Sequence, residues 1–198
     1  MNKYGLLSVI RRKGYYRRML PSELRYPNIL DRDFKATAPN QKWCTDITCI
    51  KTKEGVLFLS AIKDLYDNYI VSYKTAASQD YGLVDRTLRA AVVNEGTHSG
   101  LILHSDQGAH YTAFSYKYFV DENDIIPSMS RPGTPLDNAC AENFFSILKC
   151  ECIYRQKIKS LEEAQELVDE YIDYYNFERI QSKTGLTPYE QRQAAYAA

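Results

Sequence analysis

Three consecutive segments rich in aromatic and β-branched residues, joined by short turns, constrain the fold of this chain most. They cover residues 42–51, 56–62 and 69–73, and the turn sequences Lys53-Glu54-Gly55 and Asp67-Asn68 separate them. Connections of a few residues join antiparallel strands, whereas parallel strands need a crossover of about a dozen residues or more. The sequence therefore predicts an antiparallel three-stranded meander that begins near residue 42.

Helical periodicity and short apolar runs alternate after this meander. Apolar residues recur at helix-face spacing at Leu83, Val84, Leu88, Ala91 and Val92. Residues 101–103 form an apolar run that is typical of a strand covered on both faces. A helix over residues 112–122 and a strand that begins at residues 125–126 continue the alternation. The later strands need crossover connections, so helices are expected on the faces of the sheet.

Three further helices are predicted after a loop rich in proline and glycine. The first begins near Asn138, with Asp137 or Asn138 as its cap, and the second begins with a capping box of Ser160 and Glu163. The third begins at Thr187-Pro188, with proline in its first turn. The whole order predicts an α/β fold: a mixed five-stranded sheet, first antiparallel and then parallel, flanked by helices.

Charge is unevenly distributed along the chain. Lys and Arg total 25, as do Asp and Glu, so the net charge of zero excludes a protein that coats polyanions along its whole surface. Residues 1–27 nevertheless carry seven basic residues and one acid. We therefore predict a basic arm and linker over residues 1–40 and a folded body over residues 41–198. The arm is either a solvated tail or a phosphate-binding segment. In the second case its DNA-binding residues are Arg11, Arg12, Lys13, Arg17 and Arg18.

The sequence shows no membrane-targeting signal. No apolar run approaches the roughly 18 residues that a membrane span needs, and the basic N-terminus is not followed by an uninterrupted apolar stretch. Five cysteines at irregular spacing are typical of reduced thiols. We therefore expect a cytoplasmic protein without a membrane partner.

Three carboxylates stand where such a sheet brings side chains to one edge. Asp46 interrupts the first strand, Asp106 follows the strand at residues 101–103, and Glu142 lies one turn into a helix. A charge inside a strand is costly unless it binds something. Carboxylate oxygens suit Mg²⁺ or Mn²⁺, and two such ions align the attacking and leaving oxygens of a phosphodiester. The three residues are therefore candidate catalytic and metal-binding residues, and Lys149 shares the helix face of Glu142.

Each acid also has a purely structural interpretation. Asp46 is also suited to capping a β-bulge, Asp106 to closing a turn before Gly108, and Glu142 to complementing a helix N-terminus. Two other acids, Asp64 and Asp67, flank the second turn of the meander, where we expect a solvated turn. The three-carboxylate hypothesis therefore depends on the three residues meeting in space.

Three stretches of the chain resemble the bacterial insertion-sequence transposases whose catalytic core is similar to retroviral integrase. They are PNQKWCTDIT (39–48), LILHSDQGAHYT (101–112) and SMSRPGTPLDNACAENFFSILKCE (128–151). Thirty-five residues separate Asp106 from Glu142, the spacing for which the DD(35)E pattern of this family is named. The resemblance extends from KYGLLSVIRRK near the start to YNFERIQSKTGLTPYE near residue 190.

The resemblance implies a ribonuclease-H-like fold and a triad of Asp46, Asp106 and Glu142 that binds two Mg²⁺ or Mn²⁺ ions. The implied reaction is cleavage at transposon ends, followed by attack of the freed 3′-hydroxyl on another phosphodiester. By position, Lys149 resembles the basic residue that touches end DNA. Asn138 and Asn143 flank the glutamate and are expected either to orient it or to contact the DNA backbone. The expected partners are transposon-end and target DNA and further copies of the chain.

Family members usually carry a helix-turn-helix region ahead of the core, and this chain resembles a second-frame product that starts within or just after that region. Two other functions remain open at this point. A plain metal-dependent nuclease shares the triad chemistry, and a truncated chain that binds DNA without catalysis acts as a regulator of transposition. Strand transfer separates the transposase from the first alternative, and inhibition of a full-length enzyme identifies the second.

Overall fold

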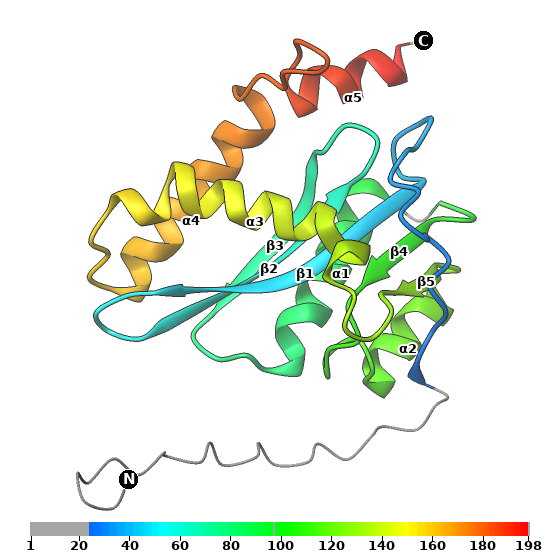
Figure 1. The fold of residues 1–198 in the computed structure, drawn as a ribbon, viewed down its shortest axis with the longest axis horizontal. Coiled ribbons are helices and arrows are strands. Elements are labelled where there is room, and N and C mark those ends of the chain that lie inside the picture. Colours follow the sequence, from blue (N-terminus) through cyan, green and yellow to red (C-terminus); the bar gives the residue numbers. More distant parts are fainter. Residues whose placement is uncertain (1–23, 97, 198) are drawn as a thin grey trace, which may run out of the picture.

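A computed structural model describes residues 24–96 and 98–197 of the chain. Its strands are β1 (Lys42–Lys51), β2 (Val56–Asp64), β3 (Ile70–Ala76), β4 (Ile102–Ser105) and β5 (Ile126–Met129). They form one five-stranded sheet in the order β3-β2-β1-β4-β5, so β1 is the central strand (Figure 1).

The sheet changes from antiparallel to parallel at β1. β1 pairs antiparallel with β2 from Trp43 opposite Asp64 to Lys51 opposite Val56, and β3 pairs antiparallel with β2. β4 runs parallel to β1, and β5 runs parallel to β4. The predicted mixed sheet is confirmed, although β3 extends to Ala76, three residues beyond the predicted end.

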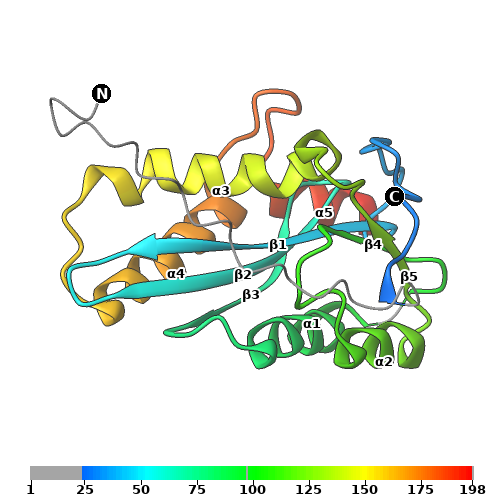
Figure 2. The same cartoon turned by 60° about the horizontal axis from the view of Figure 1, so that its bottom comes forward.

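Helices cover both faces of the sheet, as predicted. The helices are α1 (Tyr81–Glu95), α2 (Phe114–Glu122), α3 (Ala139–Glu151), α4 (Leu161–Phe177) and α5 (Pro188–Tyr196), with short 3₁₀ helices η3 (Pro135–Asn138) and η4 (Ile153–Arg155). α1 and α2 lie against one face of the sheet, and α3 and α4 lie against the other (Figure 2). None of the helices in the described part of the chain is long and apolar enough to cross a membrane.

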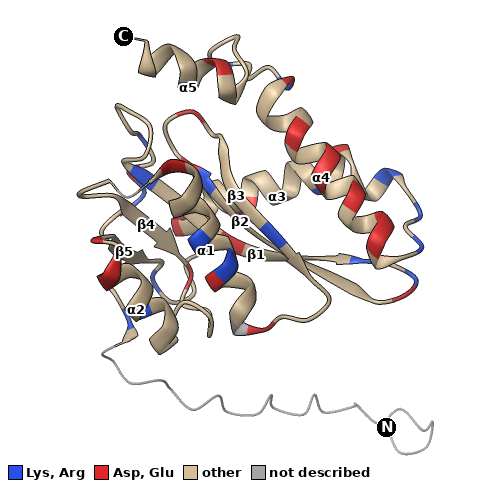
Figure 3. Ribbon diagram, turned by 180° about the vertical axis from the view of Figure 1, so that it is seen from behind, with Lys and Arg blue, Asp and Glu red and all other residues tan. Residues whose placement is uncertain are grey.

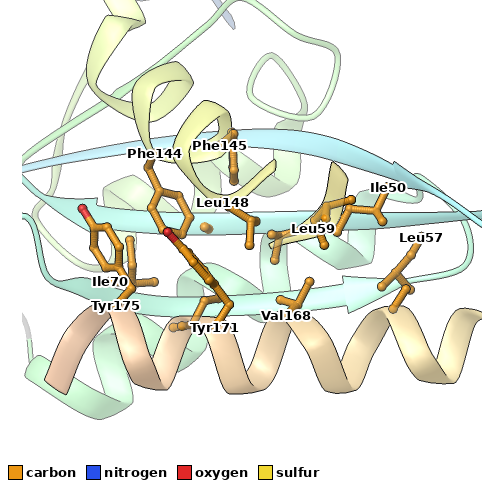
Figure 4. Packing of buried hydrophobic residues seen from close by; sticks show 14 of the residues in the cluster. Ile50, Leu57, Leu59, Ile70, Phe144, Phe145, Leu148, Val168, Tyr171 and Tyr175 are labelled. Atoms are coloured by element: carbon orange, nitrogen blue, oxygen red, sulfur yellow. The ribbon is translucent and has the colours of Figure 1, made fainter. Parts of the chain in front are cut away.

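Each face of the sheet has its own apolar core. On the α3 and α4 side, Phe144, Leu148 and Tyr175 pack on Leu59 and other strand residues (Figure 4). On the α1 and α2 side, Trp43, which is 1% exposed, belongs to the second core cluster. Burial of apolar surface stabilises a protein by about 25 cal/mol per Å², so these two layers hold β1 rigidly between them.

The segment between residue 24 and β1 packs on the body. Leu24 and Leu30 are each 2% exposed, and Ile29 and Leu30 donate backbone hydrogen bonds to the hydroxyl of Ser128 in β5. Residues 1–23, which include the predicted arm residues Arg11, Arg12, Lys13, Arg17 and Arg18, lie outside the described residues. The predicted boundary at residue 40 stays a prediction.

One of the two residues predicted to cap α3, Asn138, is its N-cap residue. The side chain of Asn138 nevertheless makes no capping hydrogen bond. Asp137 lies in η3, and its carboxylate accepts from Arg131, Arg32 and Asn28 instead. These charged partners bind a carboxylate more strongly than a free backbone N–H does, so the charge of Asp137 is used outside the helix.

The predicted solvated turn at Asp64 and Asp67 is also wrong. Both side chains are fully buried, and both bind the guanidinium of Arg192 in α5. Arg192 also pairs with Glu95 at the end of α1 and stacks on the ring of Tyr69. An arginine from the C-terminal helix therefore neutralises a turn that the local sequence presents as polar and exposed.

α5 begins with a complete capping box, which predicts a measurable cap energy. The Thr187 hydroxyl accepts from the Glu190 N–H at 3.1 Å, and the Glu190 carboxylate accepts from the Thr187 N–H at 2.8 Å. We expect Thr187→Ala to lower the free energy of unfolding by about 1 kcal/mol. Chemical denaturation measures this loss, and Thr187→Ser, which keeps the hydroxyl, is the control. An equal loss in both variants would assign the effect to packing of the methyl group.

Candidate active site

Asp46 lies near the middle of β1 on the central strand of the sheet. It is half-buried, and its own carboxylate accepts a hydrogen bond from the Ile47 N–H at 2.7 Å. Desolvation raises the pKa of Asp46 to about 7, and the negative charges of Asp106 and Glu142 add to the increase. The charge that β1 carries at this point is therefore poorly compensated by the protein itself.

Asp106 directly follows β4, the parallel neighbour of β1. Its Oδ1 accepts from the Gly108 N–H at 2.8 Å, so it closes the turn that the structural interpretation of this residue expects. A Cβ atom at position 108 would lie 2.7 Å from the same oxygen, so only glycine fits there without displacing the carboxylate. The turn and its glycine therefore hold the exposed Asp106 at the edge of the sheet.

Glu142 and Lys149 extend the site along α3. Glu142 is exposed in the first turn of the helix, whereas Lys149 is half-buried two turns later. Both residues line a cavity of about 320 Å³ with Asp46 and Ser146. The positive charge of Lys149 lowers the pKa of Asp46, against the larger effect of desolvation, so the lysine lies within electrostatic range of the strand carboxylate.

The three carboxylates meet around one hollow. Asp46, Asp106 and Glu142 line a cavity of about 380 Å³ together with the loop Arg131-Pro132-Gly133-Thr134-Pro135. Asp46 and Asp106 also share an adjoining cavity of about 420 Å³. A cavity of about 790 Å³ lies elsewhere, between α4 and the end of α3, and none of the three carboxylates lines it. The structure therefore brings the three carboxylates, which come from β1, the end of β4 and α3, to one edge of the sheet, as predicted.

The carboxylates suit a hard cation by their chemistry. Oxygen donors match Mg²⁺ and Mn²⁺, and a carboxylate such as Asp46, whose pKa is raised by desolvation and by acidic neighbours, is stabilised in its charged form by a nearby positive charge. Within residues 24–96 and 98–197, no three Asp, Glu, His or Cys side chains are placed to hold a metal ion together. Asp106 and Glu142 are exposed, so packing does not lock their side chains in one rotamer.

The predicted DNA-binding residues of the body differ in position. Asn143 is exposed on α3, whereas Asn138 is 3% exposed and donates from Nδ2 to the Thr45 carbonyl of β1 at 3.3 Å. The Oδ1 atom of Asn138 is buried without a partner beside the cavity that the three carboxylates line. Arg131 also lines this cavity, although the sequence analysis did not single it out as a site residue. The available signal was its position in the loop between β5 and Pro132.

Comparison with known proteins identifies the family of this chain. A family model described as an integrase core domain matches residues 36–135, and a second model of the same description matches residues 142–195. An uncharacterised transposase-like protein of Haemophilus influenzae is 47% identical over 167 residues, which cover 83% of this chain and 76% of that protein. The chain belongs to the insertion-sequence transposases with an integrase core domain.

Other relatives of this transposase chain are longer. A candidate transposase of insertion sequence element IS150 from Escherichia coli is 43% identical over 171 residues, which cover 86% of the chain but 60% of that protein.

The HTLV-2 integrase catalytic core domain, solved in complex with magnesium, superposes with a TM-score of 0.64 at 16% identity, covering 79% of the chain and 99% of that structure. The predicted ribonuclease-H-like fold of retroviral integrase cores is therefore confirmed.

Proposed function

We propose that this chain is the catalytic core of a DNA transposase that cleaves phosphodiesters at transposon ends and joins the freed 3′-hydroxyl to target DNA. The observation that carries the proposal is the shared cavity of Asp46, Asp106 and Glu142, in which desolvation and two acidic neighbours raise the pKa of Asp46 to about 7. A carboxylate with a perturbed pKa in a hollow is typical of catalytic sites. The names of the relatives support DNA as the substrate.

Asp46, Asp106 and Glu142 are the residues that would hold two Mg²⁺ or Mn²⁺ ions. When bound, such ions activate the attacking oxygen and neutralise charge on the leaving oxygen. The HTLV-2 integrase core was solved in complex with magnesium, which supports the choice of metal. The chain itself supplies rigid placement: β1 is locked between two cores, and Gly108 fixes the turn at Asp106.

The charge distribution indicates where DNA binds. α4 carries six acidic residues and no Lys or Arg, and Figure 3 shows acidic residues along this helix. Phosphates avoid such a face. Lys149, which lines the cavity beside Asp46 and Glu142, provides positive charge where the scissile phosphate must lie. We therefore propose that end DNA crosses α3 near Lys149 and that copies of the chain assemble on it.

Cleavage and joining of a labelled duplex in Mg²⁺ or Mn²⁺ test the function. We expect joined products from the wild-type chain and none from Glu142→Gln, which keeps the shape and removes the charge. Glu162→Gln on the acidic helix α4 is the matched control and should keep full activity. Cleavage without joining would identify a plain nuclease. Full activity of Glu142→Gln would remove this residue from the site.

Metal binding should be measurable without DNA. A ligand at about 100 times its dissociation constant stabilises the folded state by about 2.7 kcal/mol. For a chain of 198 residues this raises the melting temperature by roughly 5–10 °C. We expect Mn²⁺ to produce such a rise in the wild type and a much smaller one in Asp106→Asn, measured by differential scanning fluorimetry. An equal rise in both proteins would place the bound Mn²⁺ elsewhere.

Lys149 should contribute to DNA affinity through phosphate contact. Each lost phosphate contact lowers the slope of log affinity against log salt by about 0.9. We expect Lys149→Ala to weaken binding for all sequences alike and to reduce this slope by about one unit, as measured by fluorescence anisotropy over a salt series. Lys117→Ala on α2 is the control, because Lys117 pairs with Asp121 on the opposite face of the sheet. A slope unchanged from the wild type would remove Lys149 from the DNA interface.

A further inference from the structure

The carboxylate of Asp137 is the most heavily bonded acid near the candidate site. Its side chain is fully buried although it lies in the short helix η3, directly before α3. Oδ1 accepts from Arg32 Nε at 2.7 Å and from Arg131 Nη2 at 2.9 Å. Oδ2 accepts from Asn28 Nδ2 at 3.0 Å and from the backbone and Nε of Arg131 at 3.1 and 2.8 Å. These bonds hold the pKa of Asp137 well below its usual range, chiefly through Arg131.

The partners of Asp137 come from two different segments. Arg131 belongs to the loop that lines the carboxylate cavity, whereas Asn28 and Arg32 belong to the segment that precedes β1. Arg131 also pairs with Asp31 at 3.2 Å, so the loop and the segment are joined twice. A single buried charge therefore connects residues 28–32 to the loop beside the site.

Residues 28–32 are held in a conformation that costs free energy. Asp31 and Arg32 have φ angles of 40° and 64°, in the left-handed region that side-chain-bearing residues rarely adopt. Such residues are strained and persist where surrounding contacts enforce them. Here the Asn28 Oδ1 accepts from the Asp31 N–H at 2.8 Å, and the Arg32 side chain reaches Asp137. The turn is therefore shaped to present Arg32 to Asp137.

The same turn is fixed to β5 on its other side. The hydroxyl of Ser128 accepts from the N–H groups of Ile29 and Leu30 at 2.9 and 3.0 Å. That hydroxyl also lies 2.9 Å from Nδ1 of the buried His104. Since both lone pairs of the hydroxyl are used, it donates its proton to His104. The turn therefore rests on the parallel part of the sheet.

Apolar packing joins the turn to α3 beside Glu142. Leu30, Cys44, Leu65 and Ala141 form one buried cluster, and Ala141 is the residue before Glu142. Asn138 ties the same end of α3 to β1, because its Nδ2 donates to the Thr45 carbonyl. No side-chain cap holds the start of α3. The contacts with the buried cluster and with β1 hold it instead.

The geometry points to Asp137 as a positioning residue through which the turn at residues 28–32 sets the place of Glu142. The inference rests on the proposed function, since it gives Glu142 a role that requires accurate placement. Glu142 follows Asp137 by five residues, and η3 continues directly into α3, so a shift of Asp137 moves the first turn of the helix. Residues that orient a metal-binding side chain typically change metal affinity 10–100-fold when removed.

The test compares Arg32→Met with Arg32→Lys and Arg89→Met in the full chain. Arg32→Met removes one bond to Asp137 and leaves the bonds from Arg131 in place, so we expect the variant to fold. Arg32→Lys keeps the charge. Arg89→Met removes another arginine–aspartate pair, the more exposed one with Asp85 on α1, which lies on the opposite face of the sheet from α3. Mn²⁺ affinity is measured by electron paramagnetic resonance, and hydrogen exchange is followed at the amides of residues 142–146.

We expect Arg32→Met to weaken Mn²⁺ binding about 10-fold and to speed exchange at residues 142–146 by a similar factor. Arg32→Lys should keep Mn²⁺ affinity and amide exchange close to the wild-type values. Arg89→Met should change neither the affinity nor the exchange rates. Wild-type exchange at these amides in folded Arg32→Met would overturn the inference. Absence of Mn²⁺ binding by the wild type would instead contradict the proposed function, while the exchange rates still decide whether the turn holds α3.

Discussion

Asp46→Asn should abolish cleavage and joining and at the same time make the protein more stable. The amide keeps the shape of Asp46 but removes the charge that the proposed cations need, and losing one electrostatic contact in a catalytic site costs about 10²–10³-fold in rate. We expect a loss of at least about 10³-fold, because Asp46 is one of the three carboxylates that would hold the ions. Single-turnover assays of cleavage and joining measure this loss.

The stability gain of Asp46→Asn should depend on pH. The pKa of Asp46 is raised to about 7 in the folded chain, chiefly by desolvation, from about 3.9 in an unfolded chain. The stability associated with its protonated form is complete below the unfolded value and is lost as pH rises to about 7. Asp46→Asn has no ionisable group at this position, so its stability does not fall in this way as the pH rises. Its melting temperature should therefore match that of the wild type near pH 4 and exceed it by several degrees at pH 8.

Asp85→Asn is the control for the pH profile, because Asp85 pairs with Arg89 on the exposed side of α1. It should show no such gain at pH 8, and its catalytic rate should equal that of the wild type. A melting temperature of Asp46→Asn below that of the wild type at pH 8 would contradict the picture of a poorly compensated charge. Retained joining activity would contradict its role as a metal ligand.

Arg192→Met should lower the free energy of unfolding by about 3–5 kcal/mol, the loss expected when a buried ion pair loses one partner. Arg192 is 3% exposed, and its guanidinium binds Asp64 at 2.7 Å and Asp67 at 2.8 Å, both of which are fully buried. Desolvation already raises the pKa of Asp64 to about 6, with a further increase from Asp67. Without Arg192, two buried carboxylates must ionise side by side or stay protonated.

Urea denaturation at pH 5 and pH 8 measures this effect. The loss should be larger at pH 8, because the two carboxylates escape the penalty only by taking up protons. Arg179→Met is the matched control: Arg179 also binds a carboxylate, that of Glu151, but this pair is partly exposed to solvent. Such pairs contribute about 1 kcal/mol or less. Equal losses in the two variants would contradict the importance of burial at Arg192.

Local patterns were sufficient for the elements, and they singled out Asp46, Asp106 and Glu142 as candidates. Alternation and turn residues predicted β1 with its observed bounds, because a strand of ten residues bounded by turns carries a strong signal. The positions of Asp46, Asp106 and Glu142 on two strands and a helix followed from the same patterns. Strand ends were less well predicted, since pairing with a neighbour, as in β3 with β2, decides where a strand stops.

The misinterpreted residues are those whose partners are distant in sequence. Asp67 lies 125 residues from Arg192, and Asp137 lies 105 residues from Arg32. Arg131, which also binds Asp137, is only six residues away, but this spacing does not distinguish a buried ion pair from a turn residue or a helix cap. Only the folded chain brings each carboxylate to its distant arginine, and only there does desolvation make the pairing decisive.

By itself, the sequence determined the fold class, the order of the elements and which three carboxylates form the candidate site. These depend on periodicity, turn chemistry and residue type, which are local properties. The tertiary structure alone decided that Asp46 is poorly compensated, that Arg192 anchors α5, and that residues 28–32 hold the start of α3. These depend on distance and on exclusion of water, and both arise only when segments far apart in the chain pack together.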